Sequence, residues 1–407
     1  MMSAPPPARV AGRPQGFVLV LPSTLTVMGG IILAPVLPDL MAAFGHVPDH
    51  IFWVPALLAV PGLIAGLLSP LAGFAGDRWG RRTLLIAATL AYAVVGLLPL
   101  VLTDFAAIFV ARMALGLTEA FILVLSTALI GDYFSGRDRN RWLSGQTITA
   151  TAAALVLLPV GGLLGSALGW RGPFLAYGLA LPLAVALWRL TWDMRSHGDA
   201  GVPAPWSALP WAWLLRLCAI SIFGSILFYA VQFQIGLGLS AIGLVDSGRI
   251  GIFSAVATLG VPVGALCFWR VSDQPFARLL AAELLLAGVT LVGLGQVHAI
   301  GPFVALAFLN LVACGLLLPT LLTTAARGLD AGVRGRGIGI WQACFSIGQF
   351  ASVAVTAGVR IAWPGTSVLA AFSLLGWIAL AVAAASLFVA VRGGGAPFIA
   401  STKPRFQ

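Results

Sequence analysis

The stretch GFAGDRWGRRTLL (residues 73–85) places Asp77, Arg78, Arg81 and Arg82 within six residues. The rest of the chain is very different, because only 9% of its 407 residues are charged and 60% are hydrophobic. A mean hydropathy of +1.01 lies far outside the range of water-soluble domains. We therefore interpret the stretch as a short charged turn between two helices that cross a bilayer.

Apolar runs of the length that a spanning helix needs, about 20 residues, recur from end to end. Runs this long predict helices rather than barrel strands, because lipid offers the backbone no hydrogen-bond partner. The sequence predicts an all-α membrane protein with an N-terminal six-helix bundle over 17–192 and a C-terminal one over 211–391. A linker (193–210) and two tails (1–16 and 392–407) complete the chain. The twelve spans are expected at about 17–43, 51–73, 83–103, 105–130, 143–168, 172–192, 211–234, 248–270, 277–298, 301–326, 337–360 and 366–391.

Most of the basic residues fall in loops on one side of the predicted membrane, whereas Arg171, Arg249 and Arg360 fall on the other. By the positive-inside rule both termini and the turn at 73–85 are cytoplasmic, and we expect a bacterial inner-membrane location. The net charge of +10 is assigned to lipid headgroups rather than to nucleic acid.

Residue types that enzymes and metal sites need are scarce. The four cysteines lie in apolar spans without a CxxC pair, and neither HExxH nor GxSxG occurs. A phosphate-binding loop needs a lysine before Ser or Thr, but Lys403 precedes Pro404. The sequence therefore predicts no enzyme, no cofactor and no metal site.

The two halves resemble each other. The loop after the fourth span reads RDRNRWLSG and the loop after the tenth reads GVRGRGIGI, while Trp170 and Trp363 follow the fifth and eleventh spans. Duplicated six-helix bundles are typical of transporters, whose substrate site lies near mid-membrane between the halves.

The turn GFAGDRWGRRTLL resembles the loop 2–3 motif of the major facilitator superfamily. Its residues Gly73, Asp77, Arg78, Gly80, Arg81 and Arg82 stand where that motif places them, and APVLPDL and RMALG provide further matches. PVGGLLGSALGWRGPF is similar to the motif of proton-driven drug antiporters, although Leu158 and a single Val160 replace a glycine and a residue pair.

The resemblance implies that the charged turn is a conformational latch. It would close the cytoplasmic side when the protein opens outward, with Asp132 at the end of span four as its partner. We place Asp77 and Arg78 just past the end of helix two and expect Gly80 to allow the tight turn. The alternative is that the arginines only enforce topology.

Two charges lie inside span four. Arg112 and Glu119 are about 10 Å apart along a helix and share a face, with Gly116 as a notch between them. Charges buried in a bilayer are expected to be functional. The resemblance links Arg112 and Gly116 to proton transfer or substrate charge, whereas Glu119 is a proton carrier because loss of water favours the neutral form of a carboxyl group. Asp39 is a second carrier candidate, and structural hydrogen bonding is the alternative for the pair.

Polar and aromatic residues on other cavity-facing spans complete the candidate substrate site together with Arg112, Gly116 and Glu119. Each of these could instead form a helix-packing hydrogen bond. We expect Glu283 to reach the cytoplasmic interface or to pair with Arg270 or Arg278. The additional candidates are Tyr229, Gln232, Asn310, Trp341, Gln342, Gln349 and Gln146.

These patterns predict a monomeric, proton-coupled secondary transporter that works by alternating access and exports a small amphipathic compound by antiport. Its partners would be the substrate, protons and membrane lipid. Two alternatives remain open: a proton symporter that imports an organic acid held by Arg112, and a membrane sensor on a transporter fold that moves nothing.

Overall fold

The computed structural model describes residues 11–193 and 205–392, and every regular element in those ranges is a helix. The all-α prediction is confirmed. The predicted tails and linker lie largely in 1–10, 194–204 and 393–407, outside the described residues.

The first half contains α1 (Arg13–Val20), α2 (Pro22–Ile31), η1 (Ala34–Val36), α3 (Leu37–Ala43), α4 (His50–Trp79), α5 (Arg81–Leu97), η2 (Leu98–Leu100), α6 (Phe105–Tyr133), α7 (Gly136–Leu168), η3 (Gly169–Leu179) and α8 (Ala180–Leu190). The second half contains η4 (Trp206–Ala208), α9 (Trp211–Ala241), α10 (Ser247–Thr258), α11 (Gly260–Val271), α12 (Phe276–Leu294), α13 (Ile300–Gly328), α14 (Ala331–Ala362) and α15 (Val368–Arg392).

Eleven stretches of the described residues are long and apolar enough to cross a membrane, against twelve predicted spans. The difference arises at Gly136–Leu190, which counts as one stretch of 55 residues. This stretch reverses at Gly169, whose φ of 72° is accessible mainly to glycine. Tyr133 Oη donates to the Trp192 carbonyl (2.5 Å), and the Trp192 N–H donates back to Tyr133 Oη (2.7 Å). The stretch therefore leaves and returns to the same end of the bundle and contains two of the predicted spans.

The first predicted span is broken rather than continuous. Three prolines lie at its helix starts: Pro22 in α2, Pro35 in η1 and Pro38 in α3. Proline has no N–H to donate, so the intrahelical hydrogen bonds are interrupted. The Met28 carbonyl still accepts from the Ile32 N–H, but the carbonyls after it lie at the end of α2 and can accept hydrogen bonds from side chains.

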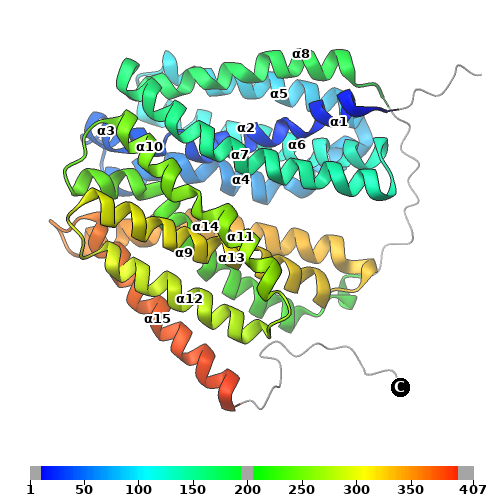
Figure 1. The fold of residues 1–407 in the computed structure, drawn as a ribbon. Coiled ribbons are helices and arrows are strands. Elements are labelled where there is room, and N and C mark those ends of the chain that lie inside the picture. The colour runs from blue at the N-terminus through cyan, green and yellow to red at the C-terminus, as the bar shows by residue number, and fades with distance from the viewer. Residues whose placement is uncertain (1–10, 194–204, 393–407) are drawn as a thin grey trace, which may run out of the picture.

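The two halves lie side by side, with α1 to α8 in the upper part of Figure 1 and most of α9 to α15 in the lower part. Helix α10 reaches into the upper part beside α3 and packs against α7. Buried apolar side chains form two clusters, one mainly from residues 18–187 and one from 209–383. We call the end that carries Asp77 and Asp132 the Arg-rich end, and the opposite end, with Asp39 and Ser247, the far end.

The charged turn at 73–85 begins one helical turn later than predicted. Helix α4 continues to Trp79, so Asp77 and Arg78 lie in its last turn rather than just past its end. The reversal itself occurs at Gly80, whose φ of 92° lies in the left-handed region. The prediction that Gly80 allows a tight turn is confirmed.

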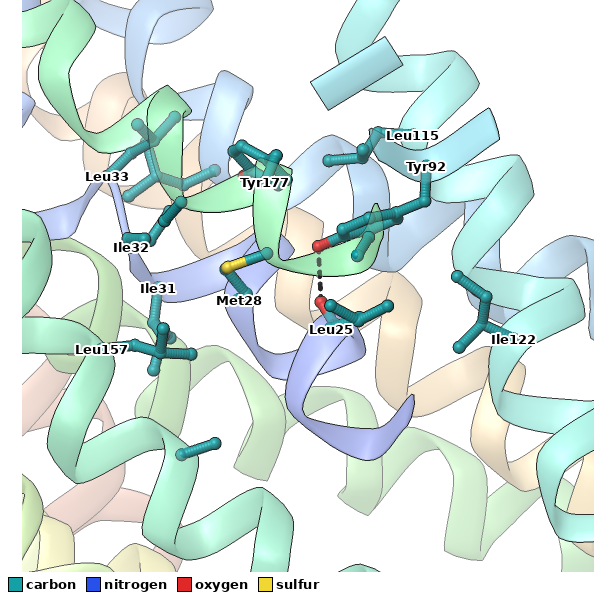
Figure 2. Close-up of a cluster of buried hydrophobic side chains, with 14 of the residues drawn as sticks. Leu25, Met28, Ile31, Ile32, Leu33, Tyr92, Leu115, Ile122, Leu157 and Tyr177 are labelled. Carbon is teal, nitrogen blue, oxygen red and sulfur yellow. Dashed lines mark hydrogen bonds between the residues drawn. The ribbon is translucent and has the colours of Figure 1, made fainter. Parts of the chain in front are cut away.

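Helix α2 is fixed in the middle of the first half by buried contacts, shown in Figure 2. Tyr92 of α5 donates its hydroxyl to the carbonyl of Leu25 over 2.6 Å, and Met28, Leu115 and Tyr177 are fully or almost fully buried around that bond. Because each of these side chains comes from a different part of the chain, the broken first span has a defined position next to α6.

Candidate functional site

A cavity of about 390 Å³ lies between the two halves. Its walls come from α2, α4, α6 and α7 of the first half and from α9, α10, α11, α13 and α14 of the second. The wall is mainly apolar and aromatic, with threonine, serine and glutamine side chains among the apolar ones. The size suits a small organic molecule.

Glu119 is the single acidic or basic side chain among the described residues that line this cavity. Helix α6 carries it, and the residue is only 3% exposed. Its Oε1 atom is buried without a hydrogen-bond partner in the described part of the chain. Gly29 of α2 approaches this carboxyl so closely that a Cβ at residue 29 would overlap Oε1 and lie 2.8 Å from Cδ. The absence of a side chain at Gly29 thus leaves room for the Glu119 carboxyl at the cavity wall, and one of its oxygens has no hydrogen-bond partner in the described residues.

Arg112 is not one of the residues that line the cavity. Its side chain is buried behind the wall and is only 2% exposed. Its Nε donates to the Leu57 carbonyl (2.8 Å), Nη1 donates to the Tyr177 hydroxyl (2.6 Å), and Nη2 donates to the Gly29 carbonyl. Two of these acceptors lack helical partners for identifiable reasons: Pro61 has no N–H to offer Leu57, and Gly29 lies in the last turn of α2. Arg112 therefore satisfies carbonyls that helix breaks leave open.

Arg112 and Glu119 share the face that helical periodicity predicts, but no ion pair joins them within the described residues. The notch predicted at Gly116 is filled by α4, because a Cβ there would meet the Pro61 carbonyl and lie 2.9 Å from Ile64. Gly116 thus serves close packing of α6 on α4 rather than opening into the cavity.

Asp39, the second predicted proton carrier, lies at the far end and away from the cavity. Its Oδ2 accepts a hydrogen bond from Ser247 Oγ of α10 over 2.5 Å. Further contacts between the halves surround this bond: Gly162 meets Gly251, and Gly236 meets the Ala34 carbonyl, at separations that leave no room for a Cβ. The far end is therefore closed.

The cavity opens toward the Arg-rich end. Leu123 lies one turn beyond Glu119 in that direction, lines the cavity and is 39% exposed. Thr147 of α7 lines the same side and is also exposed. Within the described residues, the exposed part of the cavity wall next to Glu119 thus lies on the side of the Arg-rich end.

The other predicted substrate contacts divide into two groups. Tyr229, Gln232, Gln342 and Gln349 line the cavity, and Gln232 Oε1 is buried without a partner in the described residues. The remaining three form hydrogen bonds between helices instead: Asn310 to Thr290 and Ala287, Trp341 to Ser221, and Gln146 to Ser126, Thr127 and Leu19.

The predicted latch residues gather at the Arg-rich end. Arg81 bridges Asp77 (2.7 Å) and Asp132 (2.6 Å), the partner suggested by the resemblance. Arg82 donates to Thr191 Oγ1 and to the Trp188 carbonyl. Arg78 is exposed, and Gly73 faces Val124 of α6. These contacts all lie within the first half.

Sequence reasoning missed Tyr177, Phe228 and Phe233. Tyr177 sits in η3 after a reversal at Gly169, so no helical spacing relates it to Arg112. Phe228 and Phe233 line the cavity beside Tyr229. The signal for them was present, because three aromatic side chains within six residues of one span are unusual on a face that only meets lipid.

The fold and the cavity define a multi-pass helical membrane protein with two halves around one central site. The chain belongs to the Major Facilitator Superfamily, because the model of that family matches residues 19–353. The family consists of membrane transporters rather than enzymes, so the predicted family, the fold class and the non-enzymatic character are confirmed.

Individual relatives agree with this membership. The chain is 30% identical to the drug efflux pump JefA of Mycobacterium tuberculosis over 207 residues, which cover 49% of this chain and only 38% of JefA. It is 29% identical over 293 residues to a chloramphenicol resistance protein of Pseudomonas aeruginosa, covering 68% of this chain and 67% of that protein. A solved bacterial homologue of the human lysosomal transporter Spinster, in an inward-facing and occupied conformation, superposes with a TM-score of 0.76. It covers 94% of this chain and 98% of its own at 16% identity, a likeness of fold alone.

Proposed function

We propose that this protein is a proton-coupled antiporter that exports a small amphipathic compound by alternating access. In this proposal the Arg-rich end faces the cytoplasm, and the substrate enters the central cavity from that side. One chain supplies the whole cavity, so the proposed working unit is a monomer.

Glu119 carries the proposal. A carboxylate removed from water costs several kcal/mol unless it gains a partner. The unpaired Oε1 of Glu119 lies at a cavity wall reached from one end. A proton would remove that cost, and so would a polar or cationic group of the substrate. Competition between the two for one carboxyl is the physical basis of exchange.

The rest of the wall supports an amphipathic substrate. Phe228, Tyr229 and Phe233 offer aromatic faces, while Gln232 and Gln349 offer amides that can donate and accept. The drug efflux and chloramphenicol resistance relatives make antibiotics of this kind reasonable first probes. Import of an organic acid is disfavoured, because three protein acceptors already occupy the guanidinium of Arg112.

The test uses the full chain in proteoliposomes with an imposed pH gradient and radiolabelled chloramphenicol as the probe. An acidic lumen should drive the probe inward and should dissipate the gradient through exchange. Glu119→Gln should reduce gradient-driven uptake to the level of protein-free vesicles. Glutamine retains the side-chain size but cannot release a proton.

Asp104→Asn provides the matched control. Asp104 is the N-cap of the same helix, and its carboxylate accepts from the Ala107 N–H at the far end; asparagine caps equally well. This variant should transport like the wild type. Uptake driven by the opposite gradient would indicate symport, and unchanged exchange by Glu119→Gln would refute the assigned role of Glu119.

A further inference from the structure

A second carboxyl group is buried within the helical bundle, outside the cavity lining. Glu283 of α12 is 3% exposed and is absent from the cavity wall. The expectation that it reaches the membrane interface or pairs with Arg270 or Arg278 is wrong, because both arginines are exposed and Glu283 contacts Thr320 of α13 instead. The carboxyl is therefore enclosed between helices of the second half.

Among the described residues of the helices packed against Glu283, no cation lies close enough to pair with it. Helix α12 packs against α13 and α15. On α13 the titratable or charged residues are Cys314, whose thiol donates to Asn310, and Arg327, which is exposed near the helix end. The segment of α15 from Val368 to Phe388 contains no charged residue. An ionised Glu283 would thus be a buried carboxylate without a counter-charge, which is strongly unfavourable in a membrane interior.

The hydrogen bonds around Thr320 indicate where a proton lies. Its Oγ1 is 2.7 Å from Glu283 Oε1 and 3.0 Å from the Leu316 carbonyl. A threonine hydroxyl has one hydrogen and can donate to one acceptor at a time, whereas a carbonyl can only accept. Both contacts are satisfied together if Thr320 donates to Leu316 and Glu283 donates to Thr320. That arrangement requires a protonated Glu283, and it leaves Oε2 as a neutral carbonyl oxygen.

We propose that Glu283, with Thr320 as its hydrogen-bond partner, is a second proton-binding site, outside the cavity and in the second half of the protein. Glu283 is seven residues from the start of α12 at the Arg-rich end, a depth of about 10 Å. A small separation of α12 from α13 would let water reach it from that end. The site is independent of the proposed role of Glu119, which lies on another helix in the other half.

The helix that binds Glu283 also borders the cavity. Leu318 of α13 lines the cavity wall, Thr320 contacts Glu283, and Pro319 stands between them. Proline removes one intrahelical hydrogen bond and permits bending. A bend of α13 at Pro319 would therefore move both the cavity wall at Leu318 and the Thr320 partner of Glu283.

Infrared spectroscopy of the full chain in lipid vesicles tests the site without any substrate. The spectrum recorded between neutral and alkaline pH should contain a protonated-carboxyl stretching band that disappears reversibly as pH rises. Glu283→Gln should lose this band, while Glu119→Gln, which tests the other site, should retain it. Thr320→Val should move the band to higher frequency, because the hydrogen bond is gone, and Thr320→Ser should restore its position.

Two results would overturn the assignment. Identical spectra of wild type and Glu283→Gln would mean that Glu283 is ionised. A Glu283 band that persists at every pH and does not shift in D₂O would mean a permanent structural hydrogen bond with no proton exchange. The Thr320 variants keep Glu283 in place, so the assignment stays testable even where Glu283→Gln folds poorly.

Discussion

Replacing Gly29 by alanine should disturb Glu119 directly, whereas the same change at Gly30 should not. The two glycines are neighbours in α2, and neither has a positive φ. A Cβ on Gly29 would overlap Glu119 Oε1, but a Cβ on Gly30 would meet only the Phe233 ring at 3.5 Å, an ordinary contact. Both variants keep their backbone carbonyls, including the one that binds Arg112.

The expected magnitude follows from these contacts. Alanine in place of glycine within a helix gains about 0.5–1 kcal/mol at either position. Overpacking a well-filled core costs about 1–3 kcal/mol, and this cost applies only at Gly29, where the carboxyl must move. We therefore expect Gly29→Ala to be less stable than Gly30→Ala by about 1–3 kcal/mol. Its proton-driven exchange should also fall, because the carboxyl leaves its position at the cavity wall.

Denaturant unfolding in mild detergent measures the stability difference, and the proteoliposome assay measures exchange. Combining each glycine variant with Glu119→Ala provides the decisive cycle, because the shorter side chain removes the overlap. The stability cost of Gly29→Ala should then disappear. A cost that persists in the double variant, or equal stability of the two single variants, would refute the proposed contact between residues 29 and 119.

Two further predictions concern other hydrogen bonds. Tyr177→Phe removes an acceptor from the buried guanidinium of Arg112 and should lower the free energy of unfolding by about 1–3 kcal/mol. Tyr92→Phe removes a neutral bond to a carbonyl and should cost about 1 kcal/mol; equal losses measured by denaturant unfolding would contradict this ranking. Ser247→Ala removes the bond to Asp39 between the halves and should favour opening of the far end, by about tenfold for a loss of 1.4 kcal/mol. Distances between spin labels on the far ends of α3 and α10 would report this shift, and an unchanged distribution would exclude a gating role for the bond.

Much of the fold could be predicted from local sequence patterns. Apolar runs of about 20 residues identify spanning helices because lipid leaves the backbone no alternative. The shared face of Arg112 and Glu119 follows from the 100° rotation per residue within one helix. The tight turn at Gly80 is predicted as well, and the family resemblance implies Asp132 as the partner of the charged turn. That Arg81 is the residue paired with Asp132 is seen only in the structure. Breaks are harder to predict: the apolar run at 17–43 predicts one helix, whereas the structure divides it at its prolines.

The functional roles of the polar residues depended on contacts between helices. Gln232 and Asn310 have the same kind of side chain in similar apolar spans, yet Gln232 lines the cavity and Asn310 binds Thr290. Glu283 was expected at the interface, and only the position of Thr320 shows that it is enclosed. Helical periodicity predicts the direction in which a side chain points from its own helix. It does not predict which residue of another helix the side chain will contact.

The sequence by itself determined that this chain is a duplicated bundle of membrane helices with charge at one end and an acid within the fourth span. Those features depend on hydropathy and residue spacing, which can be read from each short segment without knowing what it packs against. Only the tertiary structure decided that Arg112 donates hydrogen bonds to three protein acceptors. It also decided that Glu119 Oε1, at the cavity wall, has no hydrogen-bond partner in the described part of the chain. The first outcome depends on carbonyls left open by Pro61 within α4 and by the end of α2, which become neighbours of α6 only after the helices pack.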